Sequence, residues 1–273
     1  MTSDSAAKSV RKVARKAEDS TPFRTLARVG YAVNGLLHLL IGLIAVGVAT
    51  GTSGAKADQS GALGQLAATP GGVFVLWTVV IGLAALGLWQ VVQAFLVPAY
   101  DPKRKWAHRV IELGKGVAYL AISGTAFSFA LGAGSDAAAS TQDFTAGLLA
   151  APGGVLLIVL LGLLVLVIGG FFVYRGAARK FTEAIAVPTG PVGTAIVSLG
   201  VFGYVAKGLA LGVVGILFLV AALTASAAKA TGLDGALKAL IVLPFGPGIL
   251  IVVGVGLIAF GVYSFARARY ARL

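Results

Sequence analysis

A glycine–tyrosine motif opens two long apolar segments of this chain with identical spacing. Each copy has a glycine directly before the tyrosine and two more glycines four and eleven residues after it. The two series are Gly30, Tyr31, Gly35, Gly42 and Gly203, Tyr204, Gly208, Gly215. Self-similarity at a fixed spacing indicates a chain built from repeated supersecondary units. The fold must therefore accommodate several copies of one unit.

A third, weaker copy lies between these two. Residues 111–116 read Ile-Glu-Leu-Gly-Lys-Gly, and Ser123 followed by glycine stands where the other copies have their last glycine. The register is supported by arginine, because Arg109 precedes Gly116 by seven residues just as Arg28 precedes Gly35. We therefore predict three tandem repeats.

Each repeat contains two apolar runs, and each run exceeds the roughly 20 residues that a helix needs to cross about 30 Å of hydrocarbon. Hydrophobic residues make up 58% of the chain and the mean hydropathy is +0.94, which excludes an ordinary soluble domain. No run alternates as a lipid-facing barrel strand would. The sequence predicts an all-α integral membrane protein with six spans, near residues 25–50, 71–97, 107–133, 152–175, 192–224 and 245–266. The first run is too long for a signal peptide and lacks a convincing cleavage site, so we expect it to be retained.

Basic residues gather on one predicted side of the membrane. Seven lysines and arginines occur up to Arg28, and further groups lie within 103–115, 175–180 and 267–272. The alternate loops hold only Lys56, Lys229 and Lys238. By the positive-inside rule, this asymmetry predicts the cytoplasmic membrane with both termini in the cytoplasm. The net charge of +12 then indicates attraction to anionic lipid of the inner leaflet, and no nucleic-acid partner is expected.

The loops on the opposite side resemble one another. Each combines a short helical stretch, at 62–66, 146–149 and 235–240, with a proline that we expect to start the returning span. Asp58, Asp143 and Asp234 are candidate helix caps upstream of these stretches. The returning spans also match, because Gly87, Gly169 and Gly261 are each followed six residues later by a polar residue, namely Gln93, Arg175 and Arg267.

The threefold two-helix unit, with glycine–tyrosine near the start of its first helix and a proline–glycine turn before its second, resembles the bacterial domain of unknown function 1206 family. The resemblance covers about residues 24–268. It implies an integral membrane protein with three repeats, typical of actinobacteria, and no established activity. We divide the chain into a basic cytoplasmic tail (1–23), repeats at 24–100, 101–180 and 181–268, and a basic C-terminal tail (269–273). The first tail is predicted either as an amphipathic helix on the inner leaflet or as a disordered topology anchor.

An even number of spans leaves every repeat facing the same way, so we expect parallel helical hairpins related by a pseudo-threefold axis along the membrane normal. The 38 glycines allow helices to approach closely, and packing must drive their association in lipid. Glycine packing is therefore the expected role of nearly every glycine.

Aligning the repeats places polar residues of the first helices at three levels. The first level holds Tyr31, Glu112 and Tyr204, the second Asn34, Lys115 and Lys207, and the third His38, Tyr119 and Leu211. Offsets of three and four residues put each helix's set on one face. We predict that these residues form a polar column on the pseudo-axis, because ionisable groups in spans usually face a bundle interior or a cavity.

Two interpretations of the column stay open. Lys207, with Glu112 as its partner by level, would form an anion or proton site, and His38 could carry protons. Alternatively, Lys115 and Lys207 extend toward the inner surface, Glu112 pairs with Lys115 on its own helix, and His38 makes an interhelical hydrogen bond beside Asn34.

Signatures of catalysis are missing from the sequence. It has no nucleophile elbow, no histidine pair at metal spacing and no phosphate loop. Without cysteine and with two histidines, it offers too few ligands for zinc or haem. We expect no enzyme, no cofactor and no metal.

The sequence thus favours binding or permeation of a small ion or proton through the polar column. The alternative is a structural, accessory or lipid-binding subunit that transports nothing and packs against another membrane protein or a second copy of itself.

Overall fold

The computed structural model describes residues 21–96 and 102–272, which are helical apart from short connections. The helices are α2 (Thr21–Ala49), α3 (Gln59–Ala67), α4 (Gly72–Leu96), α5 (Pro102–Ala130), α6 (Ala137–Ala150), α7 (Gly154–Ala177), α8 (Pro191–Leu223), α9 (Gly232–Ile241) and α10 (Gly246–Tyr270), with short 3₁₀ turns η1 (Lys180–Ala184) and η2 (Ala227–Lys229). Almost all of the predicted basic tail, 1–23, lies outside the described residues.

Six helices among the described residues are long and apolar enough to cross a membrane. They occupy Ala27–Ala49, Gly72–Phe95, Arg109–Ala130, Gly154–Ala177, Pro191–Leu223 and Gly246–Tyr270. In lipid the backbone must satisfy its own hydrogen bonds, and an apolar helix does so within one segment. These helices confirm the six predicted spans, with ends within four residues of those expected.

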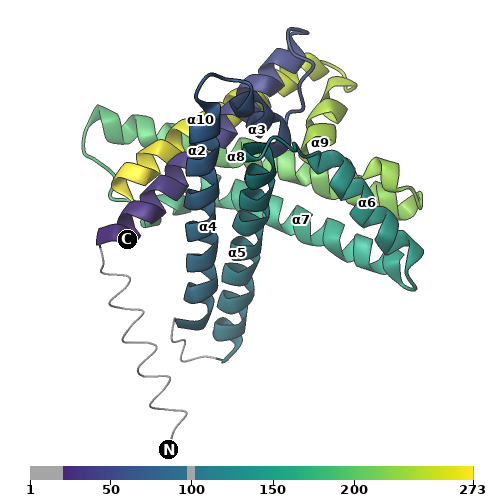
Figure 1. Cartoon of the computed structure of the whole chain (residues 1–273), viewed down its shortest axis with the longest axis horizontal. Coiled ribbons are helices and arrows are strands. Elements are labelled where there is room, and N and C mark those ends of the chain that lie inside the picture. Colours follow the sequence, from purple (N-terminus) through teal and green to yellow (C-terminus); the bar gives the residue numbers. More distant parts are fainter. Residues whose placement is uncertain (1–20, 97–101, 273) are drawn as a thin grey trace, which may run out of the picture.

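The closest helix pairs join neighbouring repeats. α4 packs along α5, α7 packs along α8, and α10 returns to pack along α2 (Figure 1). Each pair combines the second span of one repeat with the first span of the next, and the last repeat closes onto the first. The hairpin is thus the unit that repeats in the sequence, whereas the closest packing is between helices of neighbouring repeats. The three pairs run in different directions in Figure 1, and the pseudo-threefold axis stays a prediction.

Glycines set the distance within each of these pairs. A Cβ added to Gly35 would lie 2.8 Å from the carbonyl oxygen of Gly261, and one added to Gly261 would lie 2.7 Å from that of Gly35. The same reciprocal contacts join Gly87 to Gly116 and Gly169 to Gly208, at 2.6–3.0 Å. Because the obstructing atoms belong to the backbone, no side chain fits there. Small residues therefore let the backbones meet, as packing in lipid requires.

A second contact follows seven residues along every pair. Gly42 meets Gly254 and Gly215 meets Gly162 in the same reciprocal way. In the α4–α5 pair these positions are Val80 and Ser123, and the Ser123 hydroxyl donates a 2.9 Å hydrogen bond to the carbonyl oxygen of Val80. The weak middle copy of the motif thus keeps the register of the other junctions and replaces one glycine contact by a hydrogen bond.

The helices α3, α6 and α9 lie at one end of the spans, which we call the loop face. In the first two repeats the prolines do not start the returning helix as predicted, whereas in the third Pro247 lies in the first turn of α10, as predicted. Pro70, Pro152 and Pro244 each stand two residues before a helix, and the residue that follows each has a left-handed backbone: Gly71 (φ 76), Gly153 (φ 76) and Phe245 (φ 60). The turn reverses the chain there, and the helix begins at the following glycine, where a Cβ would collide with a carbonyl oxygen of the preceding loop helix.

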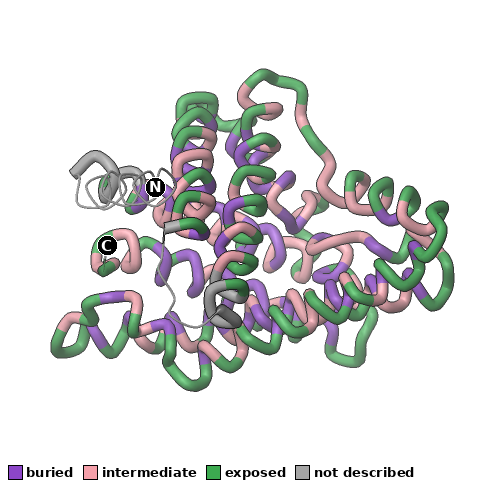
Figure 2. Tube along the Cα trace, turned by 90° about the horizontal axis from the view of Figure 1, so that it is seen from below, coloured by how far each residue is buried: buried purple, intermediate pink, exposed green. Residues whose placement is uncertain are grey.

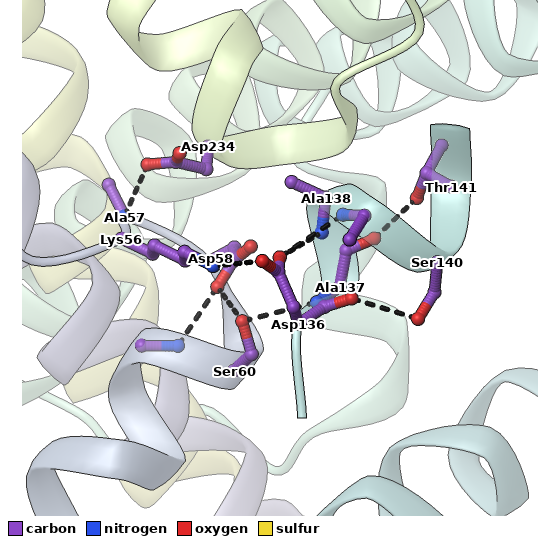
Figure 3. A network of polar contacts seen from close by, with 12 residues as sticks. Lys56, Ala57, Asp58, Ser60, Asp136, Ala137, Ala138, Ser140, Thr141 and Asp234 are labelled. Carbon is purple, nitrogen blue, oxygen red and sulfur yellow. Dashed lines mark hydrogen bonds and ion pairs between the residues drawn. The ribbon is translucent and has the colours of Figure 1, made fainter. Parts of the chain in front are cut away.

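Aspartates connect the three repeats on the loop face (Figure 3). Asp58 caps α3, accepting from the backbone N–H of Gly61 at 2.9 Å, as predicted. The cap of α6 is Asp136, not Asp143, because Asp143 lies within the helix. Asp234, in the first turn of α9, is not the cap either; it accepts from the backbone N–H of Ala57 at 2.8 Å and so joins the third repeat to the first.

Lys56 links the first repeat to the second by bonding the carboxylate of Asp136 (Figure 3). This hydrogen bond raises the pKa of Lys56 and lowers the pKa of Asp136. Both side chains are exposed by about two fifths, so solvent screens the pair. The contact fixes register between loops and adds little stability.

The largest apolar core lies between α2, α4 and α10 beneath α3. Its fully buried members include Ile41, Leu63, Val79 and Leu250. Figure 2 shows burial where helices meet and exposure along their outward faces. Because the loop helix α3 closes this core, the loop face is packed and not a set of free connections.

Candidate intramembrane binding cavity

A cavity of about 210 Å³ lies between the first helices of the three repeats. Its walls are Asn34, His38 and Ile41 of α2, Lys115, Ala118, Tyr119 and Ile122 of α5, Lys207, Ala210 and Leu211 of α8, Leu257 of α10, Gln59 of α3 and Leu233 of α9. On each first helix these residues lie three, four or seven positions after the first of them, which places them on one face. The second and third levels of the predicted polar column thus meet around one space.

Lys207 is the central cation of this cavity. It is partly buried at the middle of α8, and its ammonium nitrogen lies 4.4 Å from the ring centroid of Phe260 and 5.0 Å from that of Phe172. Among the described residues no carboxylate lies within ion-pair distance of it. Ring faces attract a cation but do not neutralise it. Among the described residues Lys207 therefore has two ring faces but no carboxylate as a partner.

Glu112 does not pair with Lys207, contrary to the partner expected from their level. Its carboxylate accepts from Lys115 at 2.6 Å, three residues along the same helix, and Glu112 is buried. Neighbours at i,i+3 meet on one helix without any displacement of the backbone, which favours the local pair. Lys115 itself lines the cavity while 45% of its side chain stays exposed.

His38 and Asn34 supply polar groups on the wall formed by α2. The Nδ1 of His38 lies 2.8 Å from the backbone carbonyl oxygen of Asn34 and donates to it, so the ring orientation is fixed. The ring also lies 4.8 Å from that of Phe260, at 54°. The predicted interhelical hydrogen bond is replaced by one within α2 and a ring contact between helices.

The first level of the predicted column is outside the cavity walls. Tyr31 lies instead at the α2–α10 junction, where Arg267 stands 4.2 Å above its ring and donates a 3.3 Å hydrogen bond to its hydroxyl. Tyr204 lies at the α7–α8 junction, with Arg175 5.8 Å from its ring centroid. Both tyrosines therefore hold arginines at junctions between repeats.

The sequence interpretation did not assign these arginines to any site. Arg175 and Arg267 follow the junction glycines Gly169 and Gly261 by six residues, and each meets the tyrosine that precedes the facing glycine by four. At the third junction the equivalent positions are Gln93 and Glu112, an amide and a carboxylate. The polar residue that recurs six positions after each junction glycine could have indicated this site. One sequence does not show, however, which helix faces that residue.

Tyr204 also belongs to an aromatic cluster beside the cavity. Its ring stacks on Phe181 at 5.1 Å and on Phe172 at 5.7 Å, and the edges of Phe260 and Tyr263 complete the cluster. The rings of Phe172 and Phe260 face the ammonium group of Lys207, so the aromatic cluster packs against this lysine from one side. Within the part of the chain that the structure describes, no group of acidic, histidine or cysteine side chains could hold a metal ion.

Three tandem two-span repeats around a small cationic cavity define a polytopic membrane protein of repeat architecture. The family model described as Domain of Unknown Function (DUF1206) matches the chain three times, at residues 29–96, 113–179 and 202–271, and the chain belongs to this family. It is similar to an uncharacterized protein, YxxB, of Bacillus subtilis (strain 168), with 28% identity over 270 residues that cover 94% of each chain. No solved structure shows a significant match.

Proposed function

We propose that this membrane protein binds a small anion in the cavity, with Lys207 as its principal cation. The supporting observation is the ammonium group of Lys207 on the cavity wall without a carboxylate in reach among the described residues. A charge inside a membrane protein is costly unless it is paired. An anion would supply the missing partner, and the side chains of Asn34 and Tyr119 would donate hydrogen bonds to it.

The packing argues against a filled, purely structural axis. A subunit that only fills space would close its centre with apolar side chains, whereas here two lysines, a histidine and an asparagine surround open volume. The outward apolar faces of α5 and α7 suit lipid as well as a partner protein, so they do not favour the accessory role. We infer binding without catalysis.

The proposal is tested by anion-dependent stability of the purified protein. Sodium acetate or phosphate is titrated against gluconate at constant ionic strength, and the thermal unfolding midpoint is followed. We expect the unfolding midpoint to rise with the anion concentration. At a hundred times the dissociation constant, the bound anion should add about 2.7 kcal/mol to the free energy of unfolding. Lys207→Met should abolish it, and Lys207→Arg should keep part of it.

The matched control is Lys180→Met. Lys180 lies outside the cavity, exposed and paired with Glu183 at 3.2 Å, so the control removes one positive charge without touching the site. Equal stabilisation of wild type and Lys207→Met, or no stabilisation of wild type, would contradict anion binding at Lys207.

We also propose that the protein lies in the cytoplasmic membrane with both termini inside, next to anionic lipid. The support is the basic residues of the termini and of the connections on their side, against three lysines on the loop face. A fluorescent reporter fused after residue 273 should be active, and a periplasmic phosphatase fused there should be inactive. The reverse result would overturn the orientation.

A further inference from the structure

The cavity is open along α5. Lys115 and Ala118 line it and are both exposed, although they lie inside the membrane span Arg109–Ala130. The cavity is therefore open beside α5, within the length of a membrane-crossing helix.

The arrangement of the helix pairs explains this opening. α5 packs along α4 and beneath α3, but the described residues give it no comparable interface with α8 on the other side of the cavity. In Figure 1 the α4–α5 pair and the α7–α8 pair diverge. α5 therefore carries one wall of the cavity without closing it.

The lining divides by chemistry. Lys207, Lys115, Tyr119 and the polar groups of α2 gather at the second and third levels of the column, and Gln59 lies at the loop face. The remaining wall is apolar and consists of Ile41, Ile122, Leu211, Leu257, Leu233, Ala118 and Ala210. Cavities that bind small molecules usually combine an apolar wall with a few placed polar groups. A free inorganic anion would use the cations but leave the apolar wall without a partner.

We propose that the occupant is an anionic amphiphile, with a carboxylate or phosphate head at Lys207 and an apolar chain that leaves between α5 and α8 into the bilayer. This inference rests on the proposed function and names the class of ligand. On the loop face, Gln59 of α3 and Leu233 of α9 line the same space, which favours the sideways route. Lys115, at the opening, would meet the head group first.

The test uses the full chain in nanodiscs of zwitterionic phosphatidylcholine, with acetate, dodecanoate and dodecanol as probes. We expect dodecanoate to bind with an apparent dissociation constant at least about tenfold lower than acetate, because the chain concentrates it in the bilayer. Dodecanol, which lacks the charge, should not bind measurably. Lys207→Met should remove the binding of both anions.

Ala118→Trp tests the route into the cavity. The new ring would fill the opening beside Lys115, so dodecanoate binding should weaken at least about tenfold, and acetate, which binds in the same cavity, should also bind more weakly. Val117→Trp is the matched control, because Val117 is adjacent, 64% exposed and not part of the cavity wall. It should change neither.

The outcomes distinguish the two proposals. Acetate binding that depends on Lys207, without any advantage for dodecanoate or any effect of Ala118→Trp, would overturn the amphiphile and leave the anion site. Dodecanol binding as tight as dodecanoate would overturn the assignment of the head group to Lys207. No binding of any anion would overturn both proposals.

Discussion

The carbonyl oxygen of Gly261 lies 2.8 Å from the point where a Cβ on Gly35 would stand, and the reverse distance is 2.7 Å. These two glycines, 226 positions apart in the 273-residue chain, close the last repeat onto the first. The same contact recurs at the other two junctions, so three equivalent glycine pairs join the neighbouring repeats.

Gly35→Ala should therefore destabilise the protein by about 1–3 kcal/mol, the usual cost of overpacking a tight interface. The methyl group would meet backbone, which cannot turn away. Gly124→Ala is the control: it is also inside a helix, but nothing lies within 4 Å of its added Cβ, so stability should stay the same or rise by up to about 1 kcal/mol. Thermal unfolding in detergent measures both, and equal midpoints for the two variants would contradict the junction.

Arg267 and Tyr31 form a cation–ring contact with a long hydrogen bond. Tyr31→Phe keeps the ring and should cost less than about 1 kcal/mol, whereas Tyr31→Leu removes the ring face and should cost about 2 kcal/mol. A double-mutant cycle with Arg267→Leu should show coupling for Tyr31→Leu. If Tyr31→Phe and Tyr31→Leu destabilise equally, the ring face is not what holds Arg267.

Phe245 has a left-handed backbone, φ 60, at a turn where the other repeats have glycine, and its side chain is 90% exposed. A residue with a Cβ pays about 1–2 kcal/mol for this conformation. Phe245→Gly should therefore stabilise the protein, by about 1 kcal/mol after the larger freedom of glycine in the unfolded chain is subtracted. Gly153→Ala at the equivalent turn should destabilise it by a similar amount. A lower midpoint for Phe245→Gly would show that the turn is not strained.

The Lys56–Asp136 pair gives a pH dependence on the loop face. The pKa of Asp136 is lowered in the folded protein. Its contribution to stability is therefore present above the pKa of the unfolded chain, near 3.9, and is lost as pH falls through the lowered pKa of the folded protein. The pKa of Lys56 is raised in the folded protein. Its contribution to stability is therefore present below the lysine pKa of the unfolded chain and is lost as pH rises through the raised pKa of the folded protein.

We expect Lys56→Met to cost less than about 1 kcal/mol between these limits, because solvent screens the pair. The difference from wild type should disappear in acid. Lys180→Met, which breaks a more exposed local pair, should show no measurable difference at any pH. A constant difference that persists into acid would contradict the ion pair with Asp136.

The sequence predicted the repeats and two of the three levels of the column, because repeated spacing fixes which faces of α2, α5 and α8 are equivalent. It did not predict that Tyr31 and Tyr204 belong to junctions. That distinction depends on which second helix faces each first helix, and one sequence holds no signal for the partner. The pairing of Glu112 with Lys115 was one of two open alternatives, and helix geometry decided for the local partner. The prolines of the first two repeats do not start the returning helices, because a left-handed turn residue after each delays the helix by two residues, whereas Pro247 does lie in the first turn of α10.

The most direct test of the central claim is native mass spectrometry of the protein released gently from its own membrane, comparing wild type with Lys207→Met and Lys180→Met. We predict that wild type and Lys180→Met retain an anionic molecule of one defined mass and that Lys207→Met arrives without it. A bare wild-type chain, or the same retained mass on Lys207→Met, would contradict a ligand site at Lys207.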